Sequence, residues 1–259
     1  MKYFFFDIDG TLTDLKTHRI VDSAKETIYK LRENGHFVAI ATGRFHYKAM
    51  DFAEKIEIDN VVCSGGGCIV INNEIVEDEP LNIEATKELL RRAEDDDVGY
   101  LLLLEDNDKV FLKDMKFIAQ AGLRRELTSY VLDENLDIEK LDKIYKVYFS
   151  IKESDIDKYS WCKSLTRMRL HPNYFVHQHD KKREGILKMM EYLKADPHEV
   201  VVFGDDSNDI DMFKGPWFKI AMGNAKEELK DIADYVTDTN INDGIKKACE
   251  HFGWINKHF

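Results

Sequence analysis

The sequence predicts an α/β protein in which a doubly wound, Rossmann-like parallel sheet carries an inserted α+β domain. In the first and last parts of the chain, short apolar segments alternate with segments of helical periodicity. These apolar segments, such as "FVAIA" and "VVVF", lack polar alternation, which is typical of parallel strands covered on both faces. The middle of the chain, residues 82–179, has a different order of predicted strands and helices and interrupts this series.

The N-terminal part reads as a βαβαβ series. We expect strands at residues 2–6, 36–41 and 60–63, and helices at residues 23–34 and 46–55. Ala24, Ile28 and Leu31 recur at helical spacing, Asp22 or Ser23 can cap the first helix, and Gly35 can end it. The opening segment therefore predicts half of a doubly wound sheet.

The middle part reads as an insertion with antiparallel strands. Helices are expected at residues 83–94 and 113–121, between the strand candidates "YLLLLED", "KVFL", "IYKVYFSI" and "YFVHQH". The turn-like "EDNDK" between two apolar runs predicts a hairpin.

After His179 the earlier rhythm returns. We expect strands at residues 200–203 and 219–221, and helices at residues 184–193, 209–213, 226–232 and 242–251. The predicted domains are a core formed by residues 1–81 and 180–259, and an insertion formed by residues 82–179.

The composition limits the classes of partner. The net charge of −12 disfavours nucleic acid and anionic membranes, and we see no apolar run of membrane length. The four cysteines show neither CxxC spacing nor the density of a secreted scaffold, which predicts reduced thiols. We expect a cytoplasmic protein that is a monomer or a weak homo-oligomer.

Carboxylates follow two of the predicted strands. Asp7 and Asp9 end the first strand in "DIDGTL", and Asp205 and Asp209 follow "VVVF" in "GDDSND". Two unit charges about 4 Å apart repel by ~4 kcal/mol at an effective dielectric of about 20, so such a pairing calls for a cation. Oxygen ligands from few carboxylates favour Mg²⁺, which commonly holds a substrate phosphate as well. The acids thus predict a metal-dependent site for phosphoryl transfer.

Two further stretches supply groups for an anion. Thr42 and Gly43 in "ATGR" follow the next strand, where a hydroxyl and backbone N–H groups make a small cradle. Arg44 either contacts substrate or pairs with a core carboxylate. The run "DKKREGIL" brings bases to the point where the chain re-enters the core, and charge alone does not choose among Lys181, Lys182 and Arg183.

The combination "DIDGTL", "TGR", Lys182 and "GDDSND", in this order around an insertion, resembles the haloacid dehalogenase superfamily of phosphohydrolases. The position of the insertion resembles the Cof-type branch with its C2B-like cap, and residues 220–245 resemble that branch's C-terminal segment. The resemblance implies a phosphatase that uses an aspartyl-phosphate intermediate and Mg²⁺.

The resemblance also implies a role for each residue. Asp7 would be the nucleophile, and Asp9 would be the general acid and then the general base. Mg²⁺ would sit among Asp7, the Asp9 main-chain carbonyl and Asp205, with Asp209 as a ligand or as a partner behind the ligands. Thr42 and Lys182 would hold phosphoryl oxygens, and Asn208 would orient that pocket.

The chain departs from the branch at "SGGGC", residues 64–68, where Asn-Gly-Ala is usual. Gly65 therefore lacks an amide that the family places near the substrate, and we expect a flexible turn there. In "VHQH", His177 and His179 are expected to pack in a hinge strand. Of the cap residues, we expect Arg124, Arg125, Arg167 and Arg169 at the surface and Trp161 and Tyr174 in the cap core.

The sequence thus predicts a Mg²⁺-dependent phosphatase of small phosphorylated metabolites, with sugar phosphates first and the cap selecting the substrate. A phosphomutase on the same scaffold is the alternative within enzymes. A signalling receiver or binding module that keeps its phosphoaspartate is the alternative outside them. The D-x-D spacing and the inserted cap argue against a receiver, because a receiver needs neither a general acid nor a lid.

Overall fold

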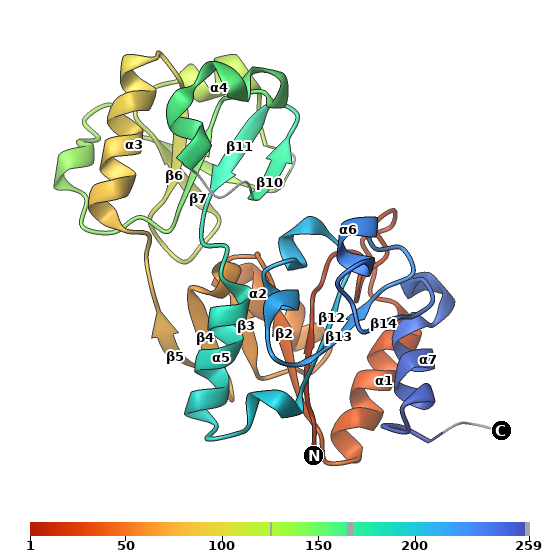
Figure 1. Cartoon of the computed structure of the whole chain (residues 1–259). Coiled ribbons are helices and arrows are strands. Elements are labelled where there is room, and N and C mark those ends of the chain that lie inside the picture. The colour runs from red at the N-terminus through yellow and green to blue at the C-terminus, as the bar shows by residue number, and fades with distance from the viewer. Residues whose placement is uncertain (125, 165–167, 257–259) are drawn as a thin grey trace. The chain divides into compact units, whose positions relative to one another are not determined.

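The computed structural model describes residues 1–124, 126–164 and 168–256 (Figure 1). The first strand, β1, lies in the middle of an eight-stranded sheet. The strands stand in the order β14-β13-β12-β1-β2-β3-β4-β5. Their bounds are β1 Tyr3–Phe6, β2 Phe37–Ala41, β3 Val61–Cys63, β4 Cys68–Ile71, β5 Glu74–Asp78, β12 Val200–Gly204, β13 Phe218–Ala221 and β14 Tyr235–Val236. The chain winds outward from β1 in one direction and from β12 in the other, so the sheet is doubly wound.

The three phenylalanines of β1 show why both faces of this sheet are covered. Phe4 and Phe6 point into a core formed with helices α1 (Asp22–Glu33), α2 (His46–Lys55) and α7 (Gly244–His251). Phe5 points into the opposite core with α5 (Lys182–Tyr192) and α6 (Glu227–Lys230). Because side chains alternate along a strand, a run of three apolar residues fills both cores.

The predicted parallel sheet is parallel from β14 to β3, and β4 and β5 add an antiparallel edge. The sequence analysis did not predict β4, β5 or β14. β5 is exposed over most of its length, and its pattern "EIVED" shows none of the continuous apolar character of the central strands. Edge strands of this kind carry little sequence signal.

The predicted helices agree with the structure except at one place. The helix expected at residues 209–213 is replaced by two 3₁₀ turns, η6 (Ser207–Asp209) and η7 (Met212–Lys214). Side chains of Asp206 and Asp209 bond backbone N–H groups in η6, which holds a tight turn in place of a helix. At α1, Gly35 follows the helix with φ +77° as expected, but neither Asp22 nor Ser23 caps the start, which lies at Val21.

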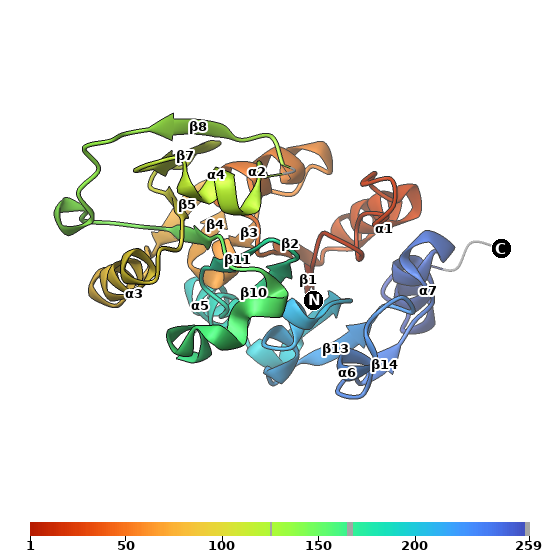
Figure 2. The ribbon, with the colours of Figure 1, turned by 90° about the horizontal axis from the view of Figure 1, so that it is seen from above.

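The inserted domain is a six-stranded sheet in the order β10-β11-β9-β6-β7-β8, with helices α3 (Ile83–Asp95) and α4 (Lys116–Ala121). Its strands are β6 Tyr100–Leu103, β7 Lys109–Leu112, β8 Ser129–Leu132, β9 Lys146–Phe149, β10 Met168–His171 and β11 Tyr174–His177. The predicted hairpin joins β6 to β7, and α3 packs with β6, β9 and β11 in one hydrophobic core. In Figure 2, β8 lies at the outer edge of this domain.

The chain divides into two units, Met1–Asp78 with Lys181–Phe259, and Glu79–Asp180. These boundaries lie within a few residues of those expected from the sequence. None of the four cysteines, all of which are buried, forms a disulfide in the described chain. Among the described residues, no helix combines the length and the apolar character that crossing a membrane requires.

We expect Phe5→Ala to lower the free energy of unfolding by about 3 to 5 kcal/mol, because Phe5 is fully buried and truncation leaves a cavity. Urea unfolding would measure the change. The matched control is Tyr29→Ala on the exposed side of α1, where the expected change is within about 0.5 kcal/mol. Equal losses for the two variants would contradict the core position of Phe5.

Candidate active site

The site begins where two neighbouring strands end. β1 and β12 are parallel and adjacent, with Phe6 opposite Phe203, and the Asp7 N–H donates to the Phe203 carbonyl at 3.0 Å. This is the point where the winding of the sheet reverses, the usual place for a ligand in such folds. Asp7 and Asp205 therefore arrive side by side at the carboxyl edge, and both are buried.

Gly10 allows the loop after β1 to pass against Asp205. Its φ is +89°, and a Cβ atom there would lie 2.0 Å from Asp205 Oδ2. The next residue, Thr11, is buried and donates from Oγ1 to Asp205 Oδ1 at 2.9 Å. Any side chain at residue 10 would displace the carboxylate, so the glycine is required by both the backbone conformation and the space.

Two asparagines from the C-terminal segment hold the same loop. Asn224 donates from Nδ2 to the Gly10 carbonyl at 2.9 Å, and Asn240 donates from Nδ2 to the Thr13 carbonyl at 2.8 Å. The Asn240 N–H in turn donates to Asn224 Oδ1 at 3.0 Å. The sequence analysis missed Thr11, Asn224 and Asn240 because hydroxyl and amide residues near turns are common and carry no specific signal.

Three carboxylates meet at this edge. One oxygen of each of Asp7, Asp205 and Asp209 lies within 4.8 Å of the others, and all three residues are buried. Burial and then the Asp209 carboxylate raise the pKa of Asp7 to about 7, although Lys182 opposes this. Burial, Asp7 and Asp209 raise the pKa of Asp205 to about 8, with the Thr11 hydrogen bond opposing. The cluster is therefore short of positive charge.

Lys182 is the cation of the cluster. Its Nζ donates to Asp7 Oδ1 and to Asp209 Oδ1, each at 2.7 Å, and the side chain is fully buried. Burial alone would lower the pKa of this ammonium, but Asp209 and Asp7 outweigh burial and raise it. Of the three bases that charge alone could not separate, Lys182 is the one in the cluster, while Lys181 lies 3.6 Å from Glu184.

Asp209 has both of its oxygens engaged. Oδ1 accepts from Lys182, and Oδ2 accepts from the N–H groups of Asp205 at 2.9 Å and Asp206 at 3.3 Å. These bonds tie the loop after β12 to the first turn of α5. The geometry favours Asp209 as a residue that holds Lys182 and the Asp205 backbone in place. Asn208 lies half-buried in η6, one residue before Asp209.

The glycine run at residues 65–67 places the start of α5. Gly66 has φ +99°, and a Cβ there would lie 2.2 Å from the Lys181 carbonyl oxygen. The Lys181 N–H donates to the Gly65 carbonyl at 2.8 Å. The expectation of a flexible turn is wrong in that the whole run is buried and packs against α5. The glycine run thereby fixes the position of Lys181, the residue before Lys182.

Asp9 does not join the acid cluster. Its carboxylate accepts from Arg44 at two points, Nη2 to Oδ1 at 2.7 Å and Nε to Oδ2 at 3.2 Å. Of the two interpretations of Arg44, the structure shows the pairing with a carboxylate. The guanidinium also lies 5.2 Å from the centre of the Phe52 ring. A two-point ion pair fixes the plane of the carboxylate, as a single contact would not.

Thr42 follows β2 at the same edge of the sheet and is buried. Its N–H donates to the Val62 carbonyl at 2.8 Å, and its Oγ1 accepts from the Arg44 N–H at 3.1 Å. The hydroxyl thus holds the turn through Gly43 that presents Arg44. Beside this turn, the Ser64 hydroxyl is buried and has no hydrogen-bond partner among the described residues.

The cap arginines and histidines differ in part from expectation. The side chain of Arg124 is only 6% exposed instead of lying at the surface. Its guanidinium carbon is 4.0 Å from the centre of the Tyr148 ring, and its Nη2 is 2.9 Å from Glu126. Arg125 and Arg167 lie outside the described residues, as does the side chain of Arg169. Trp161 and Tyr174 are buried in the cap as expected. His179 Nε2 contacts the Glu79 carbonyl at 2.9 Å, so this bond joins the first and last parts of the inserted unit.

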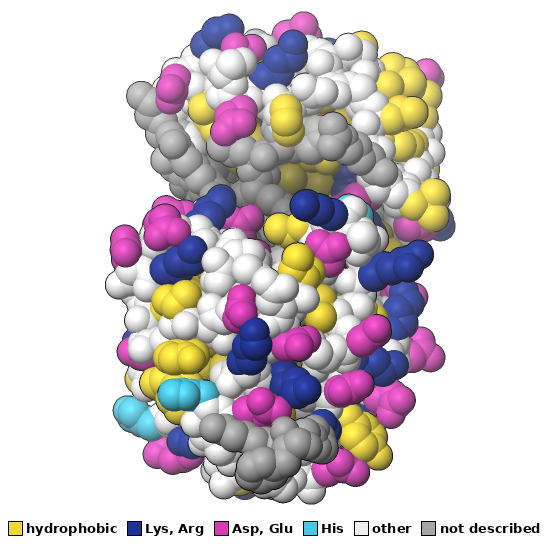
Figure 3. All heavy atoms as spheres, turned by 90° about the vertical axis from the view of Figure 1, so that its right-hand side faces the viewer, with side chains coloured by type: hydrophobic (Ala, Val, Ile, Leu, Met, Phe, Trp, Pro, Cys, Tyr) yellow, Lys and Arg dark blue, Asp and Glu magenta, His cyan; other side chains and the backbone are white. Residues whose placement is uncertain are grey.

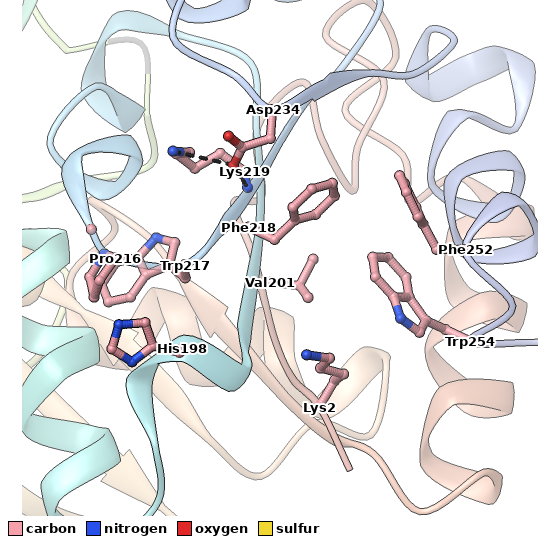
Figure 4. Close-up of a pocket in the computed structure, with 11 residues that line it drawn as sticks. Lys2, His198, Val201, Pro216, Trp217, Phe218, Lys219, Asp234, Phe252 and Trp254 are labelled. Carbon is pink, nitrogen blue, oxygen red and sulfur yellow. Dashed lines mark hydrogen bonds and ion pairs between the residues drawn. The ribbon is translucent and has the colours of Figure 1, made fainter.

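A groove of about 600 Å³ at the opposite, amino edge of the sheet is not part of this site (Figure 4). Its aromatic walls include Trp217, Phe252 and Trp254. Each of its basic side chains already faces an acid: Lys2 with Glu199 at 2.6 Å, Lys219 with Asp234 at 3.2 Å, and His198 with Asp196 at 2.9 Å. This balance of charge makes it a poor site for a phosphate.

In metal-free buffer, we expect the free energy of unfolding to fall as pH rises from about 4 to about 8. The folded pKa values of Asp7 and Asp205, about 7 and about 8, lie above the ordinary value of 3.8, so the folded state holds more protons in this window. Asp7→Asn should flatten the fall and stabilise the protein at pH 8 by on the order of 2 to 4 kcal/mol. Urea unfolding in the presence of chelator measures this free energy at each pH. The control is Asp231→Asn, which removes an exposed carboxylate. If the two variants gave the same dependence on pH, the assignment to Asp7 would be contradicted.

The comparisons with known proteins agree with this geometry. The family model for haloacid dehalogenase-like hydrolases matches residues 4–249. YkrA from Bacillus subtilis (strain 168), named as a candidate phosphatase, is 31% identical over 256 residues, which are 98% of each chain.

Two solved structures share the fold along almost the whole chain. BT1666 from Bacteroides thetaiotaomicron, described among the phosphatases of this superfamily, has a TM-score of 0.83 and 27% identity, and the match covers 98% of this chain and 96% of that one. The subclass IIB sugar phosphatase BT4131 has a TM-score of 0.78 and 28% identity, with 98% and 100% covered. The family match and these likenesses show that the chain belongs to the haloacid dehalogenase-like hydrolases and is a phosphatase, a phosphoric monoester hydrolase.

Proposed function

We propose that this phosphatase hydrolyses small phosphorylated metabolites and that sugar phosphates are its preferred substrates. The reaction would use Mg²⁺ and an aspartyl-phosphate intermediate on Asp7. The observation that carries the proposal is the buried cluster of Asp7, Asp205 and Asp209 around a single Lys182 at the switch point of the sheet. The D-x-D motif and Thr42 lie at the same edge.

The donor set fits a hard divalent cation. Three buried carboxylates face one buried ammonium, and the raised pKa values of Asp7 and Asp205 report the missing positive charge. Carboxylate oxygens are the ligands Mg²⁺ prefers. Asp7, Asp205 and the Asp9 main-chain carbonyl would hold the ion, which would neutralise charge on the phosphoryl oxygens. Both oxygens of Asp209 already accept hydrogen bonds, so Asp209 would hold Lys182 and the Asp205 main chain in place without binding the ion directly.

The residues of the chain divide the chemistry between them. An Asp7 oxygen attacks phosphorus, the Asp7–phosphorus bond forms, and the bond from phosphorus to the ester oxygen breaks. Asp9 gives a proton to the departing alcohol and takes one from the water that next attacks the phosphoaspartate. Phosphate leaves and Asp7 is regenerated. Lys182 orients the Asp7 carboxylate by its bond to Oδ1.

The phosphoryl oxygens would be held by Lys182, by the Thr42 hydroxyl and by N–H groups of the turn at Gly43, with Asn208 orienting the pocket. Arg44 we now assign to Asp9 rather than to substrate, because its guanidinium is already engaged at two points. The sugar-phosphate preference is supported by BT4131, which is named as a sugar phosphatase. The family membership argues against the receiver alternative.

We expect phosphate release from sugar phosphates in the presence of Mg²⁺, and its loss with chelator or in Asp7→Asn, because the amide cannot act as the nucleophile. A panel of sugar phosphates, nucleotides and an aryl phosphate would be assayed for inorganic phosphate. Exposed Asp231→Asn is the control of equal charge change and should retain full activity. Wild-type rates in Asp7→Asn would refute the role of Asp7, and a requirement for a sugar bisphosphate would instead indicate a mutase.

We expect Arg44→Met to lower kcat/KM for alkyl phosphates by roughly 10²-fold but for p-nitrophenyl phosphate by only a few-fold. The reason is that kcat/KM reports phosphoryl transfer to Asp7, and only a poor leaving group needs a well-placed proton from Asp9. Arg44→Lys should restore little, since one ammonium cannot reproduce the two-point contact.

The control is Asp9→Asn, which should show the same dependence on the leaving group to a greater degree. Equal losses for both substrate classes in Arg44→Met would indicate that Arg44 binds the phosphate itself. Additive losses in the double variant would show that Arg44 does not act through Asp9.

A further inference from the structure

Gly10 gives the loop after β1 a backbone that is easily rotated. The residue adopts φ +89°, and its missing side chain is what lets the loop pass Asp205. A glycine also lacks the restraint that a Cβ atom places on φ and ψ, so the peptide groups on its two sides rotate more readily than others. The loop therefore needs contacts that fix the direction of these two groups.

The first of the two peptide groups contains the Asp9 carbonyl, the main-chain oxygen that would bind Mg²⁺. In a trans peptide, the C=O of one residue and the N–H of the next lie in one plane and point in opposite directions. The Gly10 N–H donates to the Thr13 carbonyl at 3.1 Å. The position of the Thr13 carbonyl thus sets the direction in which the Asp9 carbonyl points.

Asn240, in the C-terminal segment, holds the Thr13 carbonyl. Its Nδ2 donates to that carbonyl at 2.8 Å across 227 residues of sequence, and both residues are buried. The other end of the same carboxamide, Oδ1, accepts from the Ile241 N–H at 2.9 Å, which fixes the orientation of the side chain. Because this contact is shielded from water, its loss would not be made good by solvent.

Asn224 holds the second peptide group, which contains the Gly10 carbonyl. Asn224 Nδ2 donates to this carbonyl at 2.9 Å, and Asn224 Oδ1 accepts from the Asn240 N–H at 3.0 Å. The two asparagines are therefore linked, and each restrains one of the peptide groups beside Gly10. Asn224 is exposed, so its contact competes with water and is the weaker of the two.

Binding of Mg²⁺ to the folded chain would report on this site. Among the described residues, Asp7, Asp205 and Asp209 are the only group of three or more acidic, histidine or cysteine side chains close enough to share a metal ion. On the side of the molecule where α7 lies, acidic and basic side chains are mixed at the surface (Figure 3). A titration with Mg²⁺ can therefore test what positions the ligands of the buried cluster.

We propose that Asn240, supported by Asn224, is a positioning residue for the metal site, and that it fixes the direction of the Asp9 carbonyl through the Thr13 carbonyl. This inference rests on the proposed function, because it takes the Asp9 carbonyl as a ligand of Mg²⁺. Groups that orient metal ligands from behind typically change metal affinity by about 10- to 100-fold. The Asp9 side chain is held separately by Arg44, so proton transfer by Asp9 does not depend on Asn240.

We expect Asn240→Ser to raise the dissociation constant for Mg²⁺ by roughly 10-fold. The serine hydroxyl can still accept from the Ile241 N–H, but it cannot reach the Thr13 carbonyl. Calorimetric titration of the substrate-free protein with Mg²⁺ measures the constant. The matched control is Asn34→Ser, which removes a bond of the same kind, from Asn34 Nδ2 to the Trp254 carbonyl at 2.9 Å, at the opposite edge of the sheet. This control should bind Mg²⁺ as the wild type does.

The phosphate-release assay distinguishes this role from that of Arg44. The loss of activity in Asn240→Ser should be about equal for alkyl phosphates and for p-nitrophenyl phosphate, and it should diminish as the concentration of Mg²⁺ is raised. In Arg44→Met, by contrast, the loss should depend on the leaving group and should not be repaired by added Mg²⁺.

The outcomes separate this inference from the proposed function. Wild-type affinity for Mg²⁺ in folded Asn240→Ser, or equal weakening in Asn34→Ser, would overturn the inference and leave the proposed function intact. If Asn240→Ser does not fold, Asn224→Ser at the exposed position decides: several-fold weaker Mg²⁺ binding supports the inference, and unchanged binding overturns it. A wild-type protein that binds no Mg²⁺ would overturn the proposed function and this inference together.

Discussion

An imbalance of buried charge governs this structure. Three carboxylates and one ammonium lie at the carboxyl edge of the sheet, out of reach of bulk water. Water would screen such charges, but the interior does so poorly, and the acids respond with raised pKa values. A fold selected for stability alone would not gather them. Under the function proposed above, a cation and a phosphoryl group would share this site and offset the repulsion between the carboxylates.

The surroundings of the cluster contain close backbone contacts that serve it. Gly10 lets a loop pass where any side chain would strike Asp205, and Gly66 lets a turn touch the carbonyl of Lys181. Thr11, Asn224 and Asn240 then hold the first loop from two sides. These contacts leave the carboxylates little freedom to move apart. The repulsion between them is thus retained in the folded state instead of being relaxed by a small shift of the loops.

The two acids of the D-x-D motif have different environments although one residue separates them. Asp7 is buried against Lys182, while Asp9 turns toward Arg44 and remains partly exposed. The proposed roles match these environments. Asp7, held by a buried lysine, would be positioned to attack, and the partly exposed Asp9 would be within reach of a leaving group and water.

The sequence by itself determined the doubly wound core, the inserted domain and the acids at two strand ends, because apolar runs and strand-end polarity are local signals. It also indicated Lys182, but only through the family resemblance, since three adjacent bases are equivalent by charge. Tertiary structure alone decided which base enters the cluster, because the glycine turn at residues 65–67 sets the start of α5. It likewise decided that Arg44 meets Asp9, and that a predicted helix becomes the turn η6. Each of these outcomes depends on atoms brought together from distant parts of the chain, for which neither periodicity nor composition carries a signal.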